Sequence, residues 1–330
     1  MLRQRIITAA VLLLVLVAVL ALPGPQPFAW LVLVVALLTL FEWWRMTLAL
    51  PARTAVASGG DPARPSFHQL VLHGLTGWRL VWRICTSLFA VWLFVRLLID
   101  YSALGSSLIE LMSGGSERLS PGTPGWTFAL DLLFSRLWVW AAAGWLIAAV
   151  YVFIAHTDKP PFSLAITAFG MLAVPAAGTA LLAAHARGLV YLLSLMAIVW
   201  AADIGAYFIG RAAGGPKLAP RISPGKTISG AAGGILVAVL WVGLTSLWTG
   251  EAGQYTTYGA HLVERWGLPA ALALTVMLAA VSIVGDLFES LLKRRAGRKD
   301  SSQLLPGHGG FYDRVDALLP VVPLAMLLVV

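Results

Sequence analysis

Five acidic residues stand inside apolar stretches of this chain, where a charge is costly. A charged side chain within a membrane span costs several kcal/mol, so each such residue suggests a function. The acids are Asp203 in VWAADIGAYFIGR, Asp286 and Glu289 in SIVGDLFESLLKR, and Asp313 and Asp316 in FYDRVDALLP. A spacing of three places the members of each pair on one helix face. Carboxylates gathered in this way repel one another unless protons, basic groups or a cation intervene, and their oxygens suit a hard cation such as Mg²⁺.

Two basic segments that contain several glycines flank these acids. They are GRAAGGPKLAPRISPGKTISG, from residue 210 to 230, and KRRAGRKDSSQLLPGHGGFYDR, from residue 293 to 314. Lysine and arginine attract phosphates, and glycines in GGP, SPGKT and PGHGG leave backbone amides able to approach phosphate oxygens. Acids and basic loops together predict a site where a divalent cation and a phosphorylated substrate meet.

Other phosphate-binding and hydrolytic motifs do not fit. PGKT is not a Walker A loop, because Pro220 stands where that motif needs glycine and the segment follows an apolar helix instead of a strand. The chain has neither the Ser, His and Asp arrangement of a hydrolase elbow nor an HExxH zinc pair. We therefore expect chemistry based on carboxylates and a metal ion.

The elements that must position these residues are membrane helices. The chain is 59% hydrophobic and 12% charged, about half the charged fraction of a soluble domain. A bilayer span needs about 20 apolar residues. On this basis we predict an all-α, polytopic integral membrane protein with about nine transmembrane helices, at residues 4–22, 28–48, 80–99, 132–155, 162–184, 188–210, 228–249, 268–292 and 313–330.

The distribution of charge predicts the orientation of these helices. With nine spans and a cytoplasmic N-terminus, the cytoplasmic side holds every basic residue except Arg96, Arg118, Arg136, Arg187 and Arg265. The net charge of +8 therefore reports topology and not binding to nucleic acid. All five acids then lie near the cytoplasmic face. We predict a single membrane domain over residues 1–330, with scaffold helices in 1–185 and catalytic helices and loops in 186–330.

The segment from Ser290 onward resembles the signature of the phosphatidate cytidylyltransferase (CDP-diacylglycerol synthase) family. Its fixed positions are all matched, and these are Ser290, Lys293, Arg294, Lys299, Asp300, Ser302, Leu305, Pro306, His308, Gly309, Gly310, Asp313, Arg314 and Asp316. WAADIGAYFIGR and SIVGDLFES are also similar to the family, so the resemblance covers roughly residues 195 to 325.

The resemblance implies transfer of CMP from CTP to phosphatidic acid, which gives CDP-diacylglycerol and pyrophosphate. It implies an Mg²⁺ cofactor, membrane lipid as a partner, a homodimer, and an active site facing the cytoplasm at the bacterial inner membrane. Asp286 and Asp313 are expected to bind the metal, and Asp203, Glu289 and Asp316 to form an outer shell or hold a second cation. The groups expected to bind phosphates or assist catalysis are Ser223, Lys226, Thr227, Lys293, Arg294, Lys299, His308, Gly309, Gly310 and Arg314.

The resemblance departs from the family pattern in the SPGKTISG loop. The family carries Glu where Ser229 stands and often an aromatic residue where Ile228 stands, while Ser223, Lys226, Thr227 and Gly230 match. Two alternatives to the family's reaction stay open. One is a divergent cytidylyltransferase that uses another lipid acceptor, and the other is an ion-coupled membrane transporter, since acids and glycine-broken helices also occur there.

Overall fold

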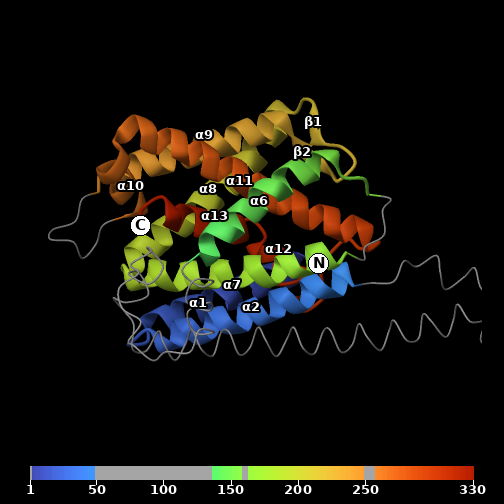
Figure 1. Ribbon diagram of the computed structural model, residues 1–330, viewed down its shortest axis with the longest axis horizontal. Coiled ribbons are helices and arrows are strands. Elements are labelled where there is room, and N and C mark those ends of the chain that lie inside the picture. Colours follow the sequence, from blue (N-terminus) through green and yellow to red (C-terminus); the bar gives the residue numbers. More distant parts are fainter. Residues whose placement is uncertain (1, 49–135, 158–162, 249–256) are drawn as a thin grey trace, which may run out of the picture.

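The computed structural model describes residues 2–48, 136–157, 163–248 and 257–330. These residues form ten helices and one small antiparallel hairpin (Figure 1). The elements are α1 (Leu2–Ala21), α2 (Gln26–Thr47), α6 (Leu137–Ile154), α7 (Leu164–Ala186), α8 (Leu189–Ala213), β1 (Lys217–Ala219), β2 (Ser223–Thr227), α9 (Ile228–Thr245), α10 (Tyr258–Trp266), α11 (Leu268–Arg295), α12 (Tyr312–Val315) and α13 (Leu318–Leu327).

Six helices among the described residues are long and apolar enough to cross a bilayer. They are α2, α6, α7, α8, α9 and α11, and each coincides with one of the predicted spans. The predicted first span is helical as α1, although its apolar part, Ile6–Ala21, is shorter than the other six. The predicted span at 80–99 lies outside the described residues. A mostly helical chain with six helices able to span a membrane is thus confirmed among the described residues, whereas the count of nine and the orientation stay predictions.

The last predicted span, residues 313–330, differs from expectation because it is two short helices. α12 ends before Asp316, and α13 begins at Leu318 after the Asp316 side chain has accepted a hydrogen bond from the amide of Ala317, at 2.8 Å. With ten residues, α13 is about 15 Å long, roughly half the hydrocarbon thickness. Val321 and Val322 are fully buried, so α13 packs inside the bundle instead of crossing it alone.

The loops that carry the predicted site residues gather at one end of the bundle. In Figure 1 the hairpin, α12 and the end of α11 lie toward one side, and α10 and the C-terminus lie toward the other. Hydrogen bonds join the gathered loops to one another. Arg294 Nε donates to the carbonyl oxygen of Ile222 in the hairpin at 3.2 Å, and Arg295 donates to the carbonyl oxygen of His156 after α6 at 3.0 Å.

A cluster of aromatic rings packs at this end of the bundle. The ring of Trp43 on α2 lies 5.0 Å from that of Tyr312 and 5.5 Å from that of Phe288 on α11, centroid to centroid. Phe169 on α7 and Trp145 on α6 complete the cluster. Buried aromatic pairs add stabilisation beyond the area they bury. The cluster therefore fixes α2, α6, α7 and α11 relative to the short helix α12.

Glycines allow α8 and α9 to approach closely, because small residues let two helix backbones come near each other. A Cβ atom built on Gly234 would lie 2.5 Å from the carbonyl oxygen of Ala202, and one on Gly230 would lie 2.9 Å from that of Ala206. Gly210 also contacts Gly230, since its Cβ would lie 3.0 Å from that residue's Cα. Gly214, four residues after Gly210, ends α8 with a positive φ of 60°.

Gly234→Ala is expected to destabilise the protein by about 1–3 kcal/mol, because the added methyl group must push α8 away from α9. Gly243→Ala is the matched control on the same helix, where a Cβ atom would make only an ordinary contact at 3.8 Å. Thermal melting of both purified variants in one detergent measures the difference. Equal melting temperatures would contradict the close packing inferred at Gly234.

Candidate active site

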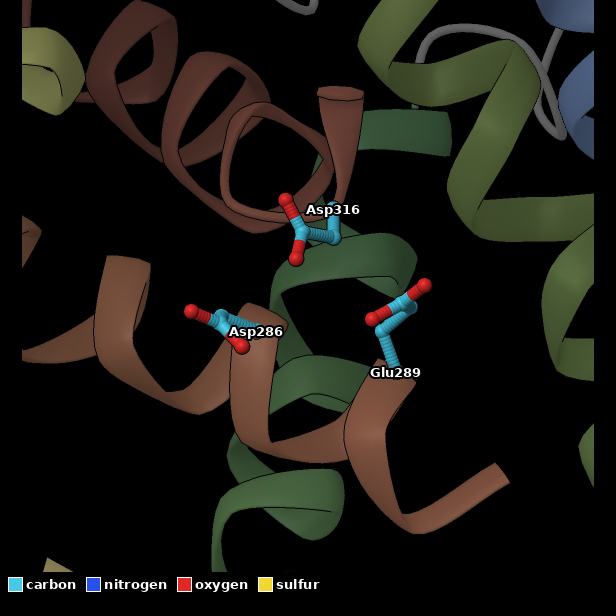
Figure 2. A group of neighbouring side chains, drawn as sticks. All are labelled: Asp286, Glu289 and Asp316. Carbon is cyan, nitrogen blue, oxygen red and sulfur yellow. The ribbon is translucent and has the colours of Figure 1, made fainter. Parts of the chain in front are cut away.

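Three carboxylates converge at the end of the bundle where the basic loops meet. Asp286, Glu289 and Asp316 each place a carboxylate oxygen so that all three oxygens lie within 4.8 Å of one another. Asp286 and Glu289 leave the same face of α11, and Asp316 reaches toward them from the segment after α12 (Figure 2). Glu289 is 1% exposed, and its Oε1 has no hydrogen-bond partner in the part of the chain that the structure describes. Such a group could hold a cation.

The local sequence explains how residues from two elements meet here. The spacing of three puts Asp286 and Glu289 on one side of α11. Gly285 lies where the chain after α12 crosses that helix, and any Cβ atom there would overlap the carbonyl oxygen of Asp316. Because residue 285 is glycine, the backbone of Asp316 can lie against α11 and bring its carboxylate to the other two.

Two lysines neutralise part of this negative charge. Lys226 on β2 forms an ion pair with Asp286. Lys293, one turn after Glu289 on α11, lies 2.5 Å from Glu289 Oε2 and 2.7 Å from Asp313 Oδ1. Lys226 thus links the hairpin to α11, and Lys293 links α11 to Asp313 on α12.

Asp313 occupies a different position from the three converging carboxylates. Its Oδ2 accepts hydrogen bonds from the amide of Gly310 at 2.7 Å and from the amide of Ser301, and lies 2.7 Å from the Ser301 hydroxyl oxygen, while Oδ1 accepts from Lys293. Burial alone would raise the pKa of Asp313, but the hydrogen bonds around it outweigh burial and lower the pKa well below its usual range. Asp313 is therefore ionised and saturated with donors. Of the expected pair, Asp286 lies in the converging group and Asp313 lies beside it.

A cavity of about 640 Å³ opens next to the carboxylates, between α8, α9, α11 and the hairpin. Its polar part is lined by Asp203, Asp286, Lys226, Arg211 and Lys217. The remaining wall is mostly alanine, glycine and isoleucine from the membrane helices. Asp203 thus shares the cavity with Asp286. The space combines charged groups at one part with a wall suited to apolar chains.

The other predicted residues fall into supporting and exposed positions. Thr227 caps α9, because its Oγ1 accepts a hydrogen bond from the amide of Gly230 at 3.1 Å. Gly309 adopts a φ of 81°, which favours glycine, and the amide of Gly310 is already bound to Asp313. That amide is therefore not available to a phosphate, contrary to expectation. The side chains of Ser223 and His308 are half-buried. Those of Arg294, Lys299 and Arg314 are exposed.

Ile228 and Ser229, the two residues that depart from the family pattern, lie where β2 of the hairpin passes into α9. The hydroxyl of Ser229 donates to the carbonyl oxygen of Gly214 and lies 3.1 Å from Thr227 Oγ1, so it ties the end of α8 to the start of α9. Ile228 is exposed at the first position of α9. The serine therefore closes the base of the hairpin.

Glu42 on α2 is absent from the sequence-based set, although it lies within the predicted span 28–48. It is fully buried and accepts hydrogen bonds from the segment that contains the signature residues, namely from Ser301, Ser302, Phe311 and Tyr312. The rule that a charge within a span suggests a function applies to Glu42 as well as to the five other acids. That signal could have found it.

The sequence of this chain is similar to a known protein family and to several bacterial proteins. A model described as the cytidylyltransferase family matches residues 3–330. A phosphatidate cytidylyltransferase of Brucella suis biovar 1 is 47% identical over 140 residues, which is 42% of this chain and 47% of that protein. One of Haemophilus influenzae is 44% identical over 137 residues, which is 42% of this chain and 44% of the relative. One of Staphylococcus epidermidis is 37% identical over 190 residues, 56% of this chain and 68% of the relative.

The two kinds of match differ in extent. The chain spans about half the length of the Brucella and Haemophilus relatives that it matches. The family model, in contrast, reaches from residue 3 to residue 330. On the strength of that match, the chain belongs to the cytidylyltransferase family.

Proposed function

We propose that this protein transfers CMP from CTP to phosphatidic acid, giving CDP-diacylglycerol and pyrophosphate. The observation that carries the proposal is the group of Asp286, Glu289 and Asp316 beside a cavity with one charged part and one apolar wall. A nucleotide triphosphate needs the charged part, and a lipid acceptor needs the apolar wall. The names of the bacterial relatives support the same reaction.

The three carboxylates fit Mg²⁺ as the cofactor. They offer hard oxygen ligands within 4.8 Å of one another, and Glu289 Oε1 is buried without a protein partner in the described ranges. Asp286, Glu289 and Asp316 would hold the ion, and Asp203, which faces the same cavity, would serve a second cation. When bound, Mg²⁺ supplies neutralisation of phosphate charge.

The chain's own side chains orient the two substrates. An oxygen of the phosphatidate phosphate attacks the α-phosphorus of CTP, and the bond from that phosphorus to the bridging oxygen breaks as pyrophosphate leaves. Lys226 and Lys293, already held beside the carboxylates, would contact the phosphates, and the exposed side chains of Lys299, Arg294 and Arg314 would bind the leaving pyrophosphate. Transfer of this kind depends on in-line positioning and on stabilisation of charge.

The proposal places the site at the cytoplasmic face of the membrane and includes a homodimer. The basic loops that surround the site favour the cytoplasmic face of the bacterial inner membrane, since cytoplasmic loops carry excess Lys and Arg. A cytoplasmic N-terminus agrees with a contact at the same end of the bundle, where Thr8 of α1 donates a hydrogen bond to the carbonyl oxygen of Pro306 at 2.8 Å. A homodimer is part of the same hypothesis.

Labelled CTP tests this function directly. Purified full-length protein, supplied with phosphatidic acid in detergent micelles and Mg²⁺, is expected to release pyrophosphate and to place the label in CDP-diacylglycerol, identified by mass spectrometry. Omission of either Mg²⁺ or phosphatidic acid should abolish the product. Uptake of solutes into liposomes without any nucleotide requirement would instead support a transporter.

A panel of acceptors separates the proposed reaction from that of a divergent relative. Ser229 stands where the family carries Glu, so the acceptor or nucleotide preference of this chain could differ from that of its relatives. Phosphatidic acid is expected to be the best substrate when compared with other phospholipids and with polyprenyl phosphates. A clear preference for one of those other acceptors would contradict the assignment of phosphatidic acid.

A further inference from the structure

A buried glutamate on α2, Glu42, holds the middle and the end of the loop between α11 and α12. Glu42 Oε1 lies 2.5 Å from Ser302 Oγ and 3.1 Å from the amide nitrogen of Phe311. Its Oε2 lies 2.8 Å from both Ser301 Oγ and the amide nitrogen of Tyr312. One carboxyl group thus joins the middle of the loop to its end, and Glu42 itself lies 270 residues before Tyr312 in the sequence.

The geometry requires two acceptor oxygens at this position. Each oxygen of Glu42 faces one backbone N–H, and backbone donors cannot turn away as hydroxyl groups can. A glutamine amide would therefore place its NH₂ group against the amide of Phe311 or of Tyr312, whichever way it is turned. A Cβ atom on Gly310 would overlap Glu42 Oε2, so the glycine also provides room for the carboxyl group.

The same hydrogen bonds lead from Glu42 toward the converging carboxylates. The hydroxyl of Ser301 lies 2.8 Å from Glu42 Oε2 and 2.7 Å from Asp313 Oδ2, so it bridges the two acids. Asp313 binds Lys293, and Lys293 binds Glu289. Displacement of the loop would therefore move Asp313 and change the charge next to Glu289.

From these contacts we infer that Glu42 is a positioning residue for the reaction, which shapes the loop of residues 296–311 and, through Ser301 and Asp313, sets the place of Lys293. It touches no substrate in this role. Its effect on catalysis rests on the proposed function, whereas its effect on the loop does not. The backbone N–H groups of Phe311 and Tyr312 and the buried carboxylate of Glu42 together favour one loop conformation. Small displacements of reacting groups in an active site lower the reaction rate strongly.

Glu42→Gln tests the inference with two separate measurements on purified full-length protein. Hydrogen exchange, followed by mass spectrometry without substrates, is expected to become faster in peptides that contain Phe311 and Tyr312 and to stay unchanged in α10 at the opposite end. The kcat for CMP transfer is expected to fall about 100-fold while KM for CTP changes little, because the reacting groups are misplaced.

Thr39→Val is the matched control on the same helix. Thr39 is also fully buried, but among the described residues its hydroxyl bonds only to the carbonyl oxygen of Val35 one turn earlier, so the change alters α2 without touching the loop. Its exchange pattern and kcat are expected to match those of the unsubstituted protein. An equal loss in both variants would show that any polar change on α2 is harmful and would overturn the inference.

Other results for Glu42→Gln would also refute a positioning role for Glu42. Unchanged exchange at Phe311 and Tyr312 in Glu42→Gln, or exchange raised equally in α10, would refute a local positioning role, whatever reaction the protein catalyses. If Glu42→Gln does not fold, Ser302→Ala removes one of the four donors and is expected to give a smaller change in the same two measurements. Exchange and kcat in Ser302→Ala identical to those of the unsubstituted protein would then overturn the inference. An inactive unsubstituted protein would count only against the proposed reaction.

Discussion

Replacing Asp286 by Asn is expected to abolish Mg²⁺-dependent release of pyrophosphate from CTP and phosphatidic acid. Asp286 is one of three converging carboxylates and also pairs with Lys226, so the change removes a metal ligand and the partner that holds the lysine. A loss of about 1000-fold in kcat/KM corresponds to the several kcal/mol that metal-based charge stabilisation supplies. A coupled pyrophosphatase assay measures the rate.

Glu264→Gln is the control for this prediction. Glu264 is exposed on α10, at the opposite end of the bundle, and the substitution also removes one carboxylate. It is expected to leave the rate unchanged. Substantial activity remaining in Asp286→Asn would remove Asp286 from the metal site and would leave the proposed reaction dependent on similarity to relatives alone.

Lys293→Met is expected to abolish the proposed CMP transfer and to lower the stability of the protein by about 3–5 kcal/mol, because it leaves buried carboxylates without their cation. The side chains of Lys293, Glu289 and Asp313 are 15%, 1% and 7% exposed, so water compensates little for the lost charge. Thermal melting in detergent measures the stability.

Lys299→Met provides the comparison for stability. Lys299 is exposed in the loop after α11, so its removal leaves no buried charge behind. Its melting temperature is expected to stay close to that of the unsubstituted protein. If Lys293→Met melted at the same temperature as Lys299→Met, the buried cluster would not depend on its lysine.

The sequence predicted the parts of the site that lie on one helix. The spacing of Asp286, Glu289 and Lys293 determines that all three lie on adjacent turns of α11. The spacing of Asp313 and Asp316 suggested a common face in the same way. In the structure the two carboxylates have different partners, because α12 ends between them. The amides of Ser301 and Gly310 donate hydrogen bonds to Asp313, which keep its carboxylate outside the converging group. Contacts of that kind come from loop geometry, which residue spacing does not encode.

Long-range contacts were likewise beyond sequence reasoning. Glu42 can be recognised as a charge in an apolar span, but its partners lie in a loop about 260 residues away. The half-length helix α13 reads as a weak ninth span by hydropathy, whereas in the structure Val321 and Val322 are enclosed by other helices. Apolar composition alone does not distinguish a helix that faces lipid from one that faces protein.

The distance in sequence between Glu42 and its loop has a consequence for biosynthesis. Because α2 is translated long before residues 301–312, the Glu42 carboxyl group enters the translocon and the bilayer before any of its donors exists. Glu42 lies five residues before the end of α2, so it opposes insertion by less than the about 3 kcal/mol that an acid at the centre of a helix costs. Membrane integration of α2 must therefore tolerate an unpaired carboxyl group until the ribosome has released the signature loop.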